Sequence, residues 1–393
     1  MILTPKQSEA TGKGLLITFC SISFLLIWLY LIPHHGLTSF AVTDVIQNPA
    51  GEPFYQENFA SKAQTLKAHA ASAYVVDEQL VAHWYGGSEE GAGDVQIYRA
   101  SFADGAWTRA SPIISPTRVQ HDLSRYVRKV GNPVGFSLSD GRVWLFFVSV
   151  SIGGWAGSSI NLVESHDHGQ TWGKVKRLIT SPFLNLSTLV RNPPFYYRDG
   201  TLGLPVYHEF LGKFGEILRL DSKARIVDKI RLSSGRNSLQ PVIVPTSDKH
   251  AIGLMRYAGA PPMRLLQFET FDGGNTWSLP VKLNLPNPNA AIAAIHIGDN
   301  RIMAVINNST MGRYNLSLAV SSSGHDWSVF HELESEDVSP TSHDVEFSYP
   351  SLSRDASGTF DLLYSWNDQS IKHIRFNEAW LRTKLDLTVE KQE

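Results

Sequence analysis

The stretch Ser165–Trp172, with the sequence SHDHGQTW, decides how the rest of the chain is interpreted. A near copy, TFDGGNTW, spans residues 270–277, a degenerate copy, SSSGHDW, spans 321–327, and a vestige, FADGAW, spans 102–107. In such a turn the aspartate can accept hydrogen bonds from backbone amides, and the glycine supplies a positive φ. The threonine and tryptophan then begin the next strand. Because one turn recurs, the sequence predicts a repeat architecture.

A second pattern, a tight polar turn followed by an apolar strand, occurs six times. The turns begin at Asp77, Asp140, Asp199, Asp248, Asp299 and Asp355. Successive turns are 49 to 63 residues apart, which fits a blade of four strands with its loops. The first turn pattern keeps the same step, and Asp221 stands where its missing copy would fall. The sequence therefore predicts an all-β fold, a six-bladed β-propeller over residues 68–380 followed by a C-terminal tail at 381–393.

Composition narrows the class of protein. The chain has 393 residues, a formal net charge of −2 and 42% hydrophobic residues, which suits a globular protein and gives no electrostatic case for a nucleic-acid partner. Cys20 is the only cysteine. A disulfide framework, a cysteine-ligated zinc and a cysteine nucleophile are therefore excluded from the residues after it.

Residues 14–32, GLLITFCSISFLLIWLYLI, carry no charge and are long enough to cross a bilayer as a helix. Lys6 and Lys13 precede this segment, so we expect residues 1–13 to be cytoplasmic and the propeller to be exported, in a periplasmic or extracellular location. We interpret 14–32 as an uncleaved transmembrane signal anchor, with a cleaved signal peptide as the alternative. Residues 33–67 are then a stalk that leads into the propeller.

Turns of this type in a sixfold propeller resemble the Asp-box repeats of the sialidase (neuraminidase) superfamily, and the resemblance covers roughly residues 68–380. It implies that the Asp boxes are structural turns on the blade rim, away from the active site. Asp167 and Asp272 are accordingly assigned to stability.

The resemblance also implies a site. Sialidases hold the substrate carboxylate with arginines, and Arg256 and Arg313 match two of them by their positions before the second and third boxes. Tyr349 lies in a string similar to that of the family's tyrosine nucleophile. A phenol needs a base at neutral pH, and Glu346 and Glu209 are the candidates.

Three departures from the family pattern stand beside these matches. The place of the first arginine is held by the segment 69–72, so either His69 replaces the arginine or nothing does, and Ser238 stands at the place of the glutamate partner of the tyrosine. The acid/base aspartate is expected in the loop GGSEEGAGD at residues 86–94, where Glu89, Glu90 and Asp94 are all possible.

Further polar residues stand in the segments between the predicted strands, among them His121, Arg191 and His208. In a propeller such segments converge on the mouth of the central channel, so we expect a basic, histidine-rich cleft suited to an acidic sugar. His69, His121 and His208 could alternatively be metal ligands, but their spacing is not that of a known metal site. We expect no metal and no cofactor.

The leading functional hypothesis is a sialidase-like exo-glycoside hydrolase acting on a carboxylated sugar of a glycan or polysaccharide. A polysaccharide lyase, with a histidine or tyrosine base removing the proton next to a uronate carboxylate, is the alternative enzyme. A non-catalytic, membrane-tethered propeller that binds carbohydrate is the third possibility.

Overall fold

A computed structural model describes residues 18, 21–22, 38–42, 51–181, 185–336 and 345–389. Its contacts divide the chain into two units, residues 1–37 and 38–393. None of the helices among the described residues is both long enough and apolar enough to cross a membrane. The span expected at 14–32 lies outside the described residues, except for Thr18, Ser21 and Ile22, and so does the whole of 1–13. The anchor and the localisation remain predictions.

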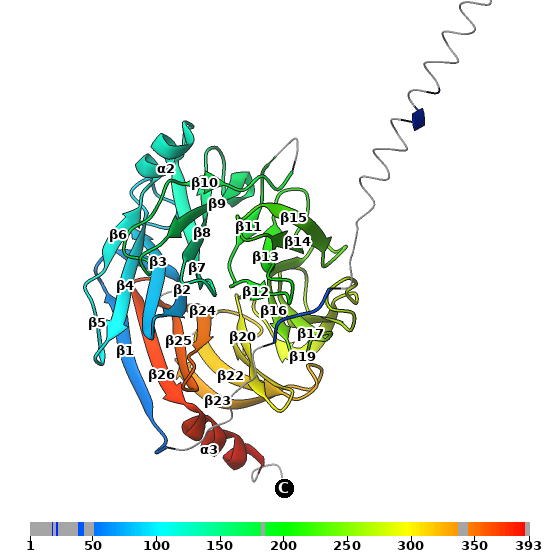
Figure 1. Cartoon of the computed structure of the whole chain (residues 1–393). Coiled ribbons are helices and arrows are strands. Elements are labelled where there is room, and N and C mark those ends of the chain that lie inside the picture. Colours follow the sequence, from blue (N-terminus) through cyan, green and yellow to red (C-terminus); the bar gives the residue numbers. More distant parts are fainter. Residues whose placement is uncertain are drawn as a thin grey trace, which may run out of the picture. The chain divides into compact units, whose positions relative to one another are not determined.

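Six antiparallel sheets arranged in a ring confirm the six-bladed propeller (Figure 1). Blade 1 consists of β2 (Lys67–Val76), β3 (Gln79–Gly87), β4 (Gln96–Ala103), β5 (Ala106–Trp107) and β6 (Ser111–Ile114). Blade 2 consists of β7 (Lys129–Ser137), β8 (Val143–Val150), β9 (Ser158–Ser165) and β10 (Lys176–Arg177). Blade 3 consists of β11 (Leu189–Val190), β12 (Phe195–Tyr196), β13 (Leu202–His208), β14 (Phe214–Leu220) and β15 (Ile226–Arg231).

The remaining blades follow the same plan. Blade 4 consists of β16 (Ser238–Pro245), β17 (Ala251–Tyr257), β18 (Arg264–Thr270) and β19 (Val281–Pro286). Blade 5 consists of β20 (Ala293–Gly298), β21 (Arg301–Ile306), β22 (Asn315–Ser321) and β23 (Ser328–Ser335). Blade 6 consists of β24 (Phe347–Arg354), β25 (Thr359–Trp366), β26 (Ser370–Asn377) and β1 (Tyr55–Lys62). Among the described residues from 38 onwards, three short helices lie outside the sheets: α2 (Pro116–Leu123), η1 (Trp155–Gly157) and α3 (Glu378–Val389).

The first strand closes the ring. β1 pairs with β26, with Tyr55 opposite Phe376, so the propeller begins before residue 68 and the predicted lead-in at 33–67 supplies the outer strand of the last blade. Backbone hydrogen bonds thereby tie the two ends of the repeat together and cover an edge that would otherwise be open. The predicted tail also departs from expectation, because α3 packs Trp380 and Leu381 into the core of blades 5 and 6.

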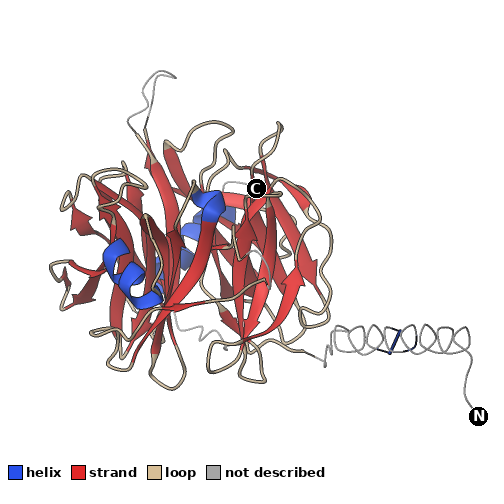
Figure 2. Cartoon of the chain, turned by 90° about the horizontal axis from the view of Figure 1, so that it is seen from above, coloured by secondary structure: helices blue, strands red, loops and turns tan. Residues whose placement is uncertain are grey.

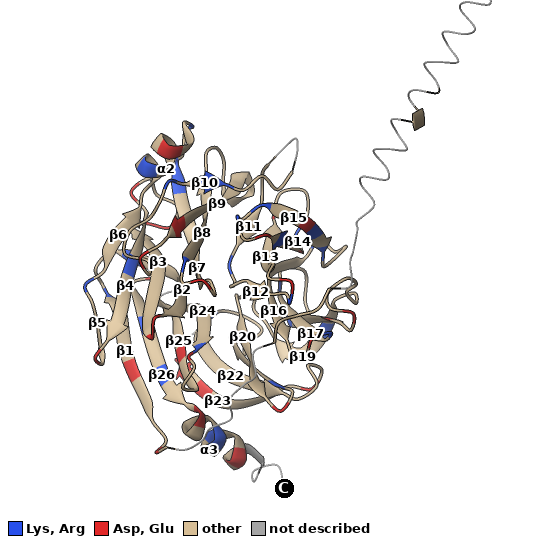
Figure 3. Cartoon of the chain, in the orientation of Figure 1, with Lys and Arg blue, Asp and Glu red and all other residues tan. Residues whose placement is uncertain are grey.

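The core lies between neighbouring blades, and burial explains the strand patterns. β8, with the sequence VWLFFVSV, is buried along its whole length, because blades cover both of its faces. β15, at an outer edge, alternates between half-buried and exposed residues. Strands make up nearly the whole ring, and charges of both signs are interspersed over it (Figures 2 and 3).

The Asp boxes form the same turn twice. Asp167 Oδ1 accepts a hydrogen bond from the Thr171 amide at 2.8 Å, and Asp272 Oδ1 accepts one from the Thr276 amide at 3.0 Å. Both turns join the third strand of a blade to the fourth, and Asp221 occupies the equivalent turn in blade 3. Trp172 and Trp277, which we expect to be largely buried, are only half-buried. The ring of Trp172 contacts that of His83, and the ring of Trp277 contacts that of Phe268.

The two faces of the ring differ in their connections. The innermost strand of each blade begins at one face, here called the site face, where the loops between second and third strands also lie. The polar turns and the Asp boxes lie at the opposite face, because antiparallel strands alternate in direction. The chain joins the propeller at that opposite face, where the Thr38 hydroxyl donates to the Gly273 carbonyl at 2.8 Å.

Candidate active site

Breaks in the innermost strands mark the site. Pairing with the second strand shifts at His69/Ser72, Gly131/Val134, Leu239/Val242 and Ser348/Ser351. Each break holds a non-glycine residue with a positive φ: Ala70 (55°), Asn132 (46°), Gln240 (54°) and Tyr349 (53°). Bulges redirect side chains, and strained backbone of this kind gathers at functional sites. The repeated break therefore points to the axis of the ring, near the site face.

The structure brings together the two arginines predicted to clamp a carboxylate. Arg256 comes from β17 of blade 4, and its Nε donates to Asn289 Oδ1 at 2.6 Å. Arg313 comes from the β21–β22 loop of blade 5, and its Nη2 donates to the Asn289 carbonyl at 3.1 Å. Asn289, which the sequence did not single out for this position, thus holds both guanidinium groups in place.

Tyr349 lies between cations and a histidine. The guanidinium carbons of Arg191 and Arg313 are 5.4 and 5.5 Å from the centre of its ring, and the ring of His69 is 4.5 Å away in an edge-to-face contact. In the part of the chain that the structure describes, the Tyr349 hydroxyl has no hydrogen-bond partner. Neither Glu346 nor Glu209, the bases expected for it, is bonded to it.

Arg191 forms the floor of the site. Its Nη2 donates to the carbonyls of Tyr349 and Pro350 at 2.6 and 3.0 Å, and its Nη1 donates to the Ala71 carbonyl at 3.1 Å. Blades 3 and 6 are opposite one another in the ring, so this side chain crosses the axis. Burial lowers the pKa of Arg191 to about 10. Its contacts are with backbone, so its position suits holding Tyr349 better than contacting a ligand.

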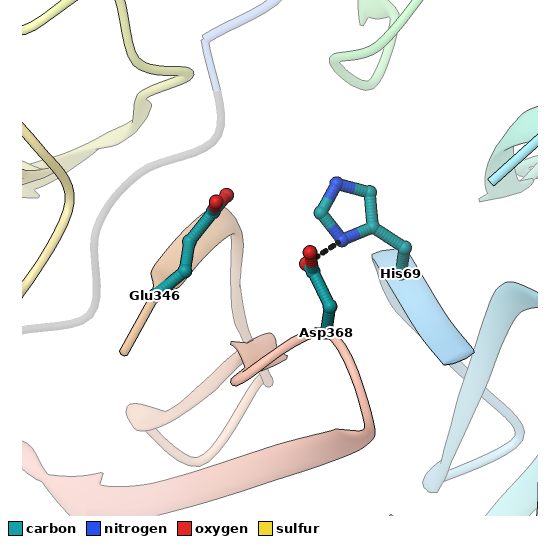
Figure 4. A group of neighbouring side chains, drawn as sticks. All are labelled: His69, Glu346 and Asp368. Carbon is teal, nitrogen blue, oxygen red and sulfur yellow. Dashed lines mark ion pairs between the residues drawn. The ribbon is translucent and has the colours of Figure 1, made fainter. Parts of the chain in front are cut away.

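His69, Asp368 and Glu346 form a cluster beside Tyr349 (Figure 4). The Nδ1 atom of His69 lies 2.6 Å from Asp368 Oδ1, and Arg313 Nη1 lies 2.6 Å from Glu346 Oε1. Burial alone would raise the pKa of Asp368, but the contact with His69 and the charge of Lys67 more than offset it, and the pKa is lowered. The sequence analysis missed Asp368, which sits in the Asn367–Asp368 turn, where both residues have a φ of 53°.

A nitrogen and two carboxylates within 4.8 Å of one another could, by their chemistry, hold a divalent cation. Glu346 is already paired with Arg313, however, and Asp368 with His69. Each carboxylate of the cluster therefore already has a partner within the protein.

The contacts of the acidic loop between β3 and β4 distinguish the three carboxylates that are candidates for the catalytic acid. Asp94 accepts hydrogen bonds from the Ser88 amide and hydroxyl at 3.0 and 2.9 Å, which closes the loop. Glu89 and Glu90 instead line a pocket of about 40 Å³ together with His69 and Asp368. Burial, and next the charge of Glu90, raise the pKa of Tyr85 on the wall of this pocket.

Other predicted residues lie elsewhere. His121 is on α2 with its side chain 88% exposed, where it contacts Asp122. His208 places Nε2 2.7 Å from Glu216 and stacks on Phe214, within blade 3. The expectation that these histidines join His69 in one cleft is therefore wrong.

Two further positions bear on the expected base of Tyr349. Glu209 is a candidate for it, and Ser238 stands where the family has a glutamate. Glu209 is half-buried, and this burial raises its pKa, although the charge of Arg256 opposes the shift. Ser238, at the place of the family's glutamate, is buried, with its hydroxyl 2.7 Å from that of Ser233. A carboxylate is thus replaced there by a hydroxyl pair.

A ring of six blades closed by its first strand, with Asp-box turns on one face and an arginine–tyrosine site on the other, defines a sialidase-type propeller. Residues 78–362 match the family model described as the BNR repeat-like domain. The match covers more than half of the chain, and the chain belongs to this family.

Solved structures share the fold at low sequence identity. The Hadza microbial sialidase Hz136 is 16% identical with a TM-score of 0.66, and the match covers 81% of this chain and 68% of that one. The intramolecular trans-sialidase from Ruminococcus gnavus is 14% identical with a TM-score of 0.62, over 82% of this chain and 97% of that one. A protein of unknown function from Dyadobacter fermentans is 14% identical with a TM-score of 0.64, and the match covers 82% of this chain and 99% of that one. No curated protein matches the sequence.

Proposed function

We propose that the chain is an exo-acting glycoside hydrolase that removes a carboxylated sugar, of the sialic acid class, from a glycan. One observation carries this proposal: Arg256 and Arg313, from two blades, meet on Asn289, and Arg313 also lies over the ring of Tyr349. Arg256 and Arg313 are 57 positions apart in the sequence and have no local reason to meet.

The chemistry of the two arginines suits a sugar carboxylate. A guanidinium group is planar, keeps its charge and can donate two parallel hydrogen bonds to a carboxylate. Hydrogen bonds to Asn289 fix both groups before a ligand arrives, so little side-chain entropy is lost on binding. Charge elsewhere on the propeller is mixed, so the attraction for an acidic sugar is local to this site (Figure 3).

Tyr349 suits attack on a sugar that already carries a negative charge. A neutral phenol is not repelled by the substrate's carboxylate, whereas a carboxylate nucleophile would be. The guanidinium groups of Arg191 and Arg313 close to its ring favour the charged phenolate as it forms. The sialidases among the structural neighbours support the same class of reaction, although at their low identity they show the fold alone.

The test is turnover of an aryl α-sialoside by the purified full-length chain. We expect release of the aryl group by the wild type, loss of turnover in Tyr349→Phe, and a large rise in KM in Arg256→Ala. Absence of release by a folded wild-type protein, with this and with natural sialosides, would contradict the proposal.

A lyase acting on uronate-containing polysaccharides is the second candidate. It is favoured by the lack of a carboxylate bonded to the Tyr349 hydroxyl among the described residues, together with the contact of His69 with the same ring. A lyase creates a carbon–carbon double bond, so its product absorbs in the ultraviolet. Rising absorbance with a uronate polymer, without release from sialosides, would favour this candidate.

A further inference from the structure

We propose that His69, oriented by Asp368, accepts the proton of the Tyr349 hydroxyl when the nucleophile attacks. The inference rests on the proposed function and assigns the base that the hydrolysis requires. It gives the histidine at the position of the family's first arginine a chemical role, and it adds Asp368, a residue of another blade, to the site.

The orientation of the imidazole supports this role. Asp368 lies 2.6 Å from Nδ1, and Nε2 points away from the carboxylate (Figure 4). The contact is an ion-pair distance without hydrogen-bond geometry, and the attraction between the carboxylate and a proton on Nδ1 favours the tautomer that leaves the lone pair of Nε2 free. The side chain of His69 is only 6% exposed, so few water molecules compete for that lone pair.

Both partners are fixed before a substrate binds. The rings of His69 and Tyr349 are in contact, with centres 4.5 Å apart. Tyr349 has a φ of 53°, is followed by Pro350 and is held at its carbonyl by Arg191. Asp368 is fixed by its turn, and its carbonyl accepts a hydrogen bond from the Ala68 amide, next to His69, at 2.7 Å. Strain tolerated at a residue that is held so firmly is typical of preorganised sites.

The other groups around His69 are less suited to accept the proton of the Tyr349 hydroxyl. Tyr85 also contacts the imidazole, with ring centres 5.6 Å apart, and its raised pKa keeps the phenol protonated, so it cannot accept the proton. Glu346 is paired with Arg313, and Ser238 replaces the family's glutamate. Among the described residues, the further charged groups that line the same pocket are Lys67, Glu89 and Glu90.

The step balances as follows. A bond forms between Tyr349 Oη and the anomeric carbon, and the bond from that carbon to the leaving oxygen breaks. The phenolic proton moves to His69 Nε2, and the leaving oxygen takes a proton from a carboxylic acid of the β3–β4 loop, Glu89 or Glu90. In the second step water attacks the anomeric carbon and gives its proton to the same carboxylate. The tyrosine oxygen leaves and takes its proton back from His69, which regenerates the site.

The test uses Asp368→Asn and His69→Ala in the full-length chain. Asparagine tolerates the positive φ of position 368, so the turn is kept. We expect kcat on aryl α-sialosides to fall by roughly 10²- to 10⁴-fold in His69→Ala, the range typical of a lost general base. Added imidazole should restore part of it. In Asp368→Asn kcat should fall while KM changes little, because the imidazole loses the carboxylate that orients it.

Varying the pKa of the aryl leaving group distinguishes a base that acts on the nucleophile from a group that acts on the leaving oxygen. A base that acts on the nucleophile lowers the rate about equally for aryl groups of low and high pKa, so an effect that grows with leaving-group pKa would overturn the assignment. Full activity of His69→Ala, or no rescue by imidazole, would also overturn it. His166→Ala, an exposed histidine of the first Asp box, is the matched control. If the wild type itself shows no turnover, the proposed function fails rather than the role of His69.

Discussion

The Nη2 atom of Arg191 lies 2.6 Å from the carbonyl oxygen of Tyr349, so a buried cation of blade 3 holds the backbone of the proposed nucleophile in blade 6. The two residues are 158 positions apart and meet across the axis of the ring. The proposed nucleophile is thereby held in position by a residue of the opposite blade.

We expect Arg191→Met to destabilise the protein by about 3 kcal/mol or more, because buried carbonyls that lose their donor cost about 1–3 kcal/mol each. Three carbonyls are affected, those of Ala71, Tyr349 and Pro350. Denaturant unfolding measures the loss. A variant with unchanged stability would show that these hydrogen bonds are not made in solution.

The Asp boxes should contribute stability that depends on pH. The hydroxyl of Thr171, and next its amide, lower the pKa of Asp167 to about 2. Since the folded pKa lies below the unfolded value, this stability is present above about pH 4 and is lost as pH falls towards 2. The thermal midpoint of the wild type should therefore exceed that of Asp167→Asn at pH 6, and the gap should narrow at pH 3. Turnover at pH 6 and moderate temperature should be equal in the two proteins.

Arg256→Ala should weaken binding of a free acidic sugar by at least tenfold, since one half of the carboxylate clamp is removed and each such charged contact is worth about 1.5–3 kcal/mol. Calorimetric titration with N-acetylneuraminic acid measures the effect. Arg225→Ala, which removes a 73% exposed arginine on the opposite face, is the control. Equal loss in both variants would indicate a general electrostatic effect instead of a clamp.

Glu209 should lower stability at neutral pH. Burial raises its pKa, so the folded state disfavours the charged form, and this cost appears as pH rises above the unfolded value of about 4.3. We expect Glu209→Gln to raise the thermal midpoint at pH 7 and to change it little at pH 4. A variant that is less stable than the wild type at pH 7 would mean that the attraction between the charges of Glu209 and Arg256 outweighs burial.

The fold could be predicted because its signals are local. An Asp box makes its hydrogen bonds within eight residues, so SHDHGQTW reveals the turn directly, and its recurrence gives the repeat. The edge strand β1 carried no such signal. It pairs with β26 more than 300 positions later, and a partly exposed edge strand shows little hydrophobic pattern.

The site could be predicted only in part, because some of its contacts join residues that are far apart in the sequence. Arg256, Arg313 and Tyr349 follow a family pattern, but Asp368 meets His69 across 299 positions through closure of the ring. One local signal was available for the bulges. A proline follows the positive-φ residue in three innermost strands, as Pro133, Pro241 and Pro350.

The most direct test of the central claim is trapping of the covalent intermediate. The full-length chain, incubated with 2,3-difluorosialic acid, is digested and analysed by mass spectrometry. The proposed hydrolysis by tyrosine attack predicts a peptide that carries one fluorosialyl group on Tyr349, with none in Tyr349→Phe. An active wild type that gains no such group, or gains it on another residue, would contradict the account.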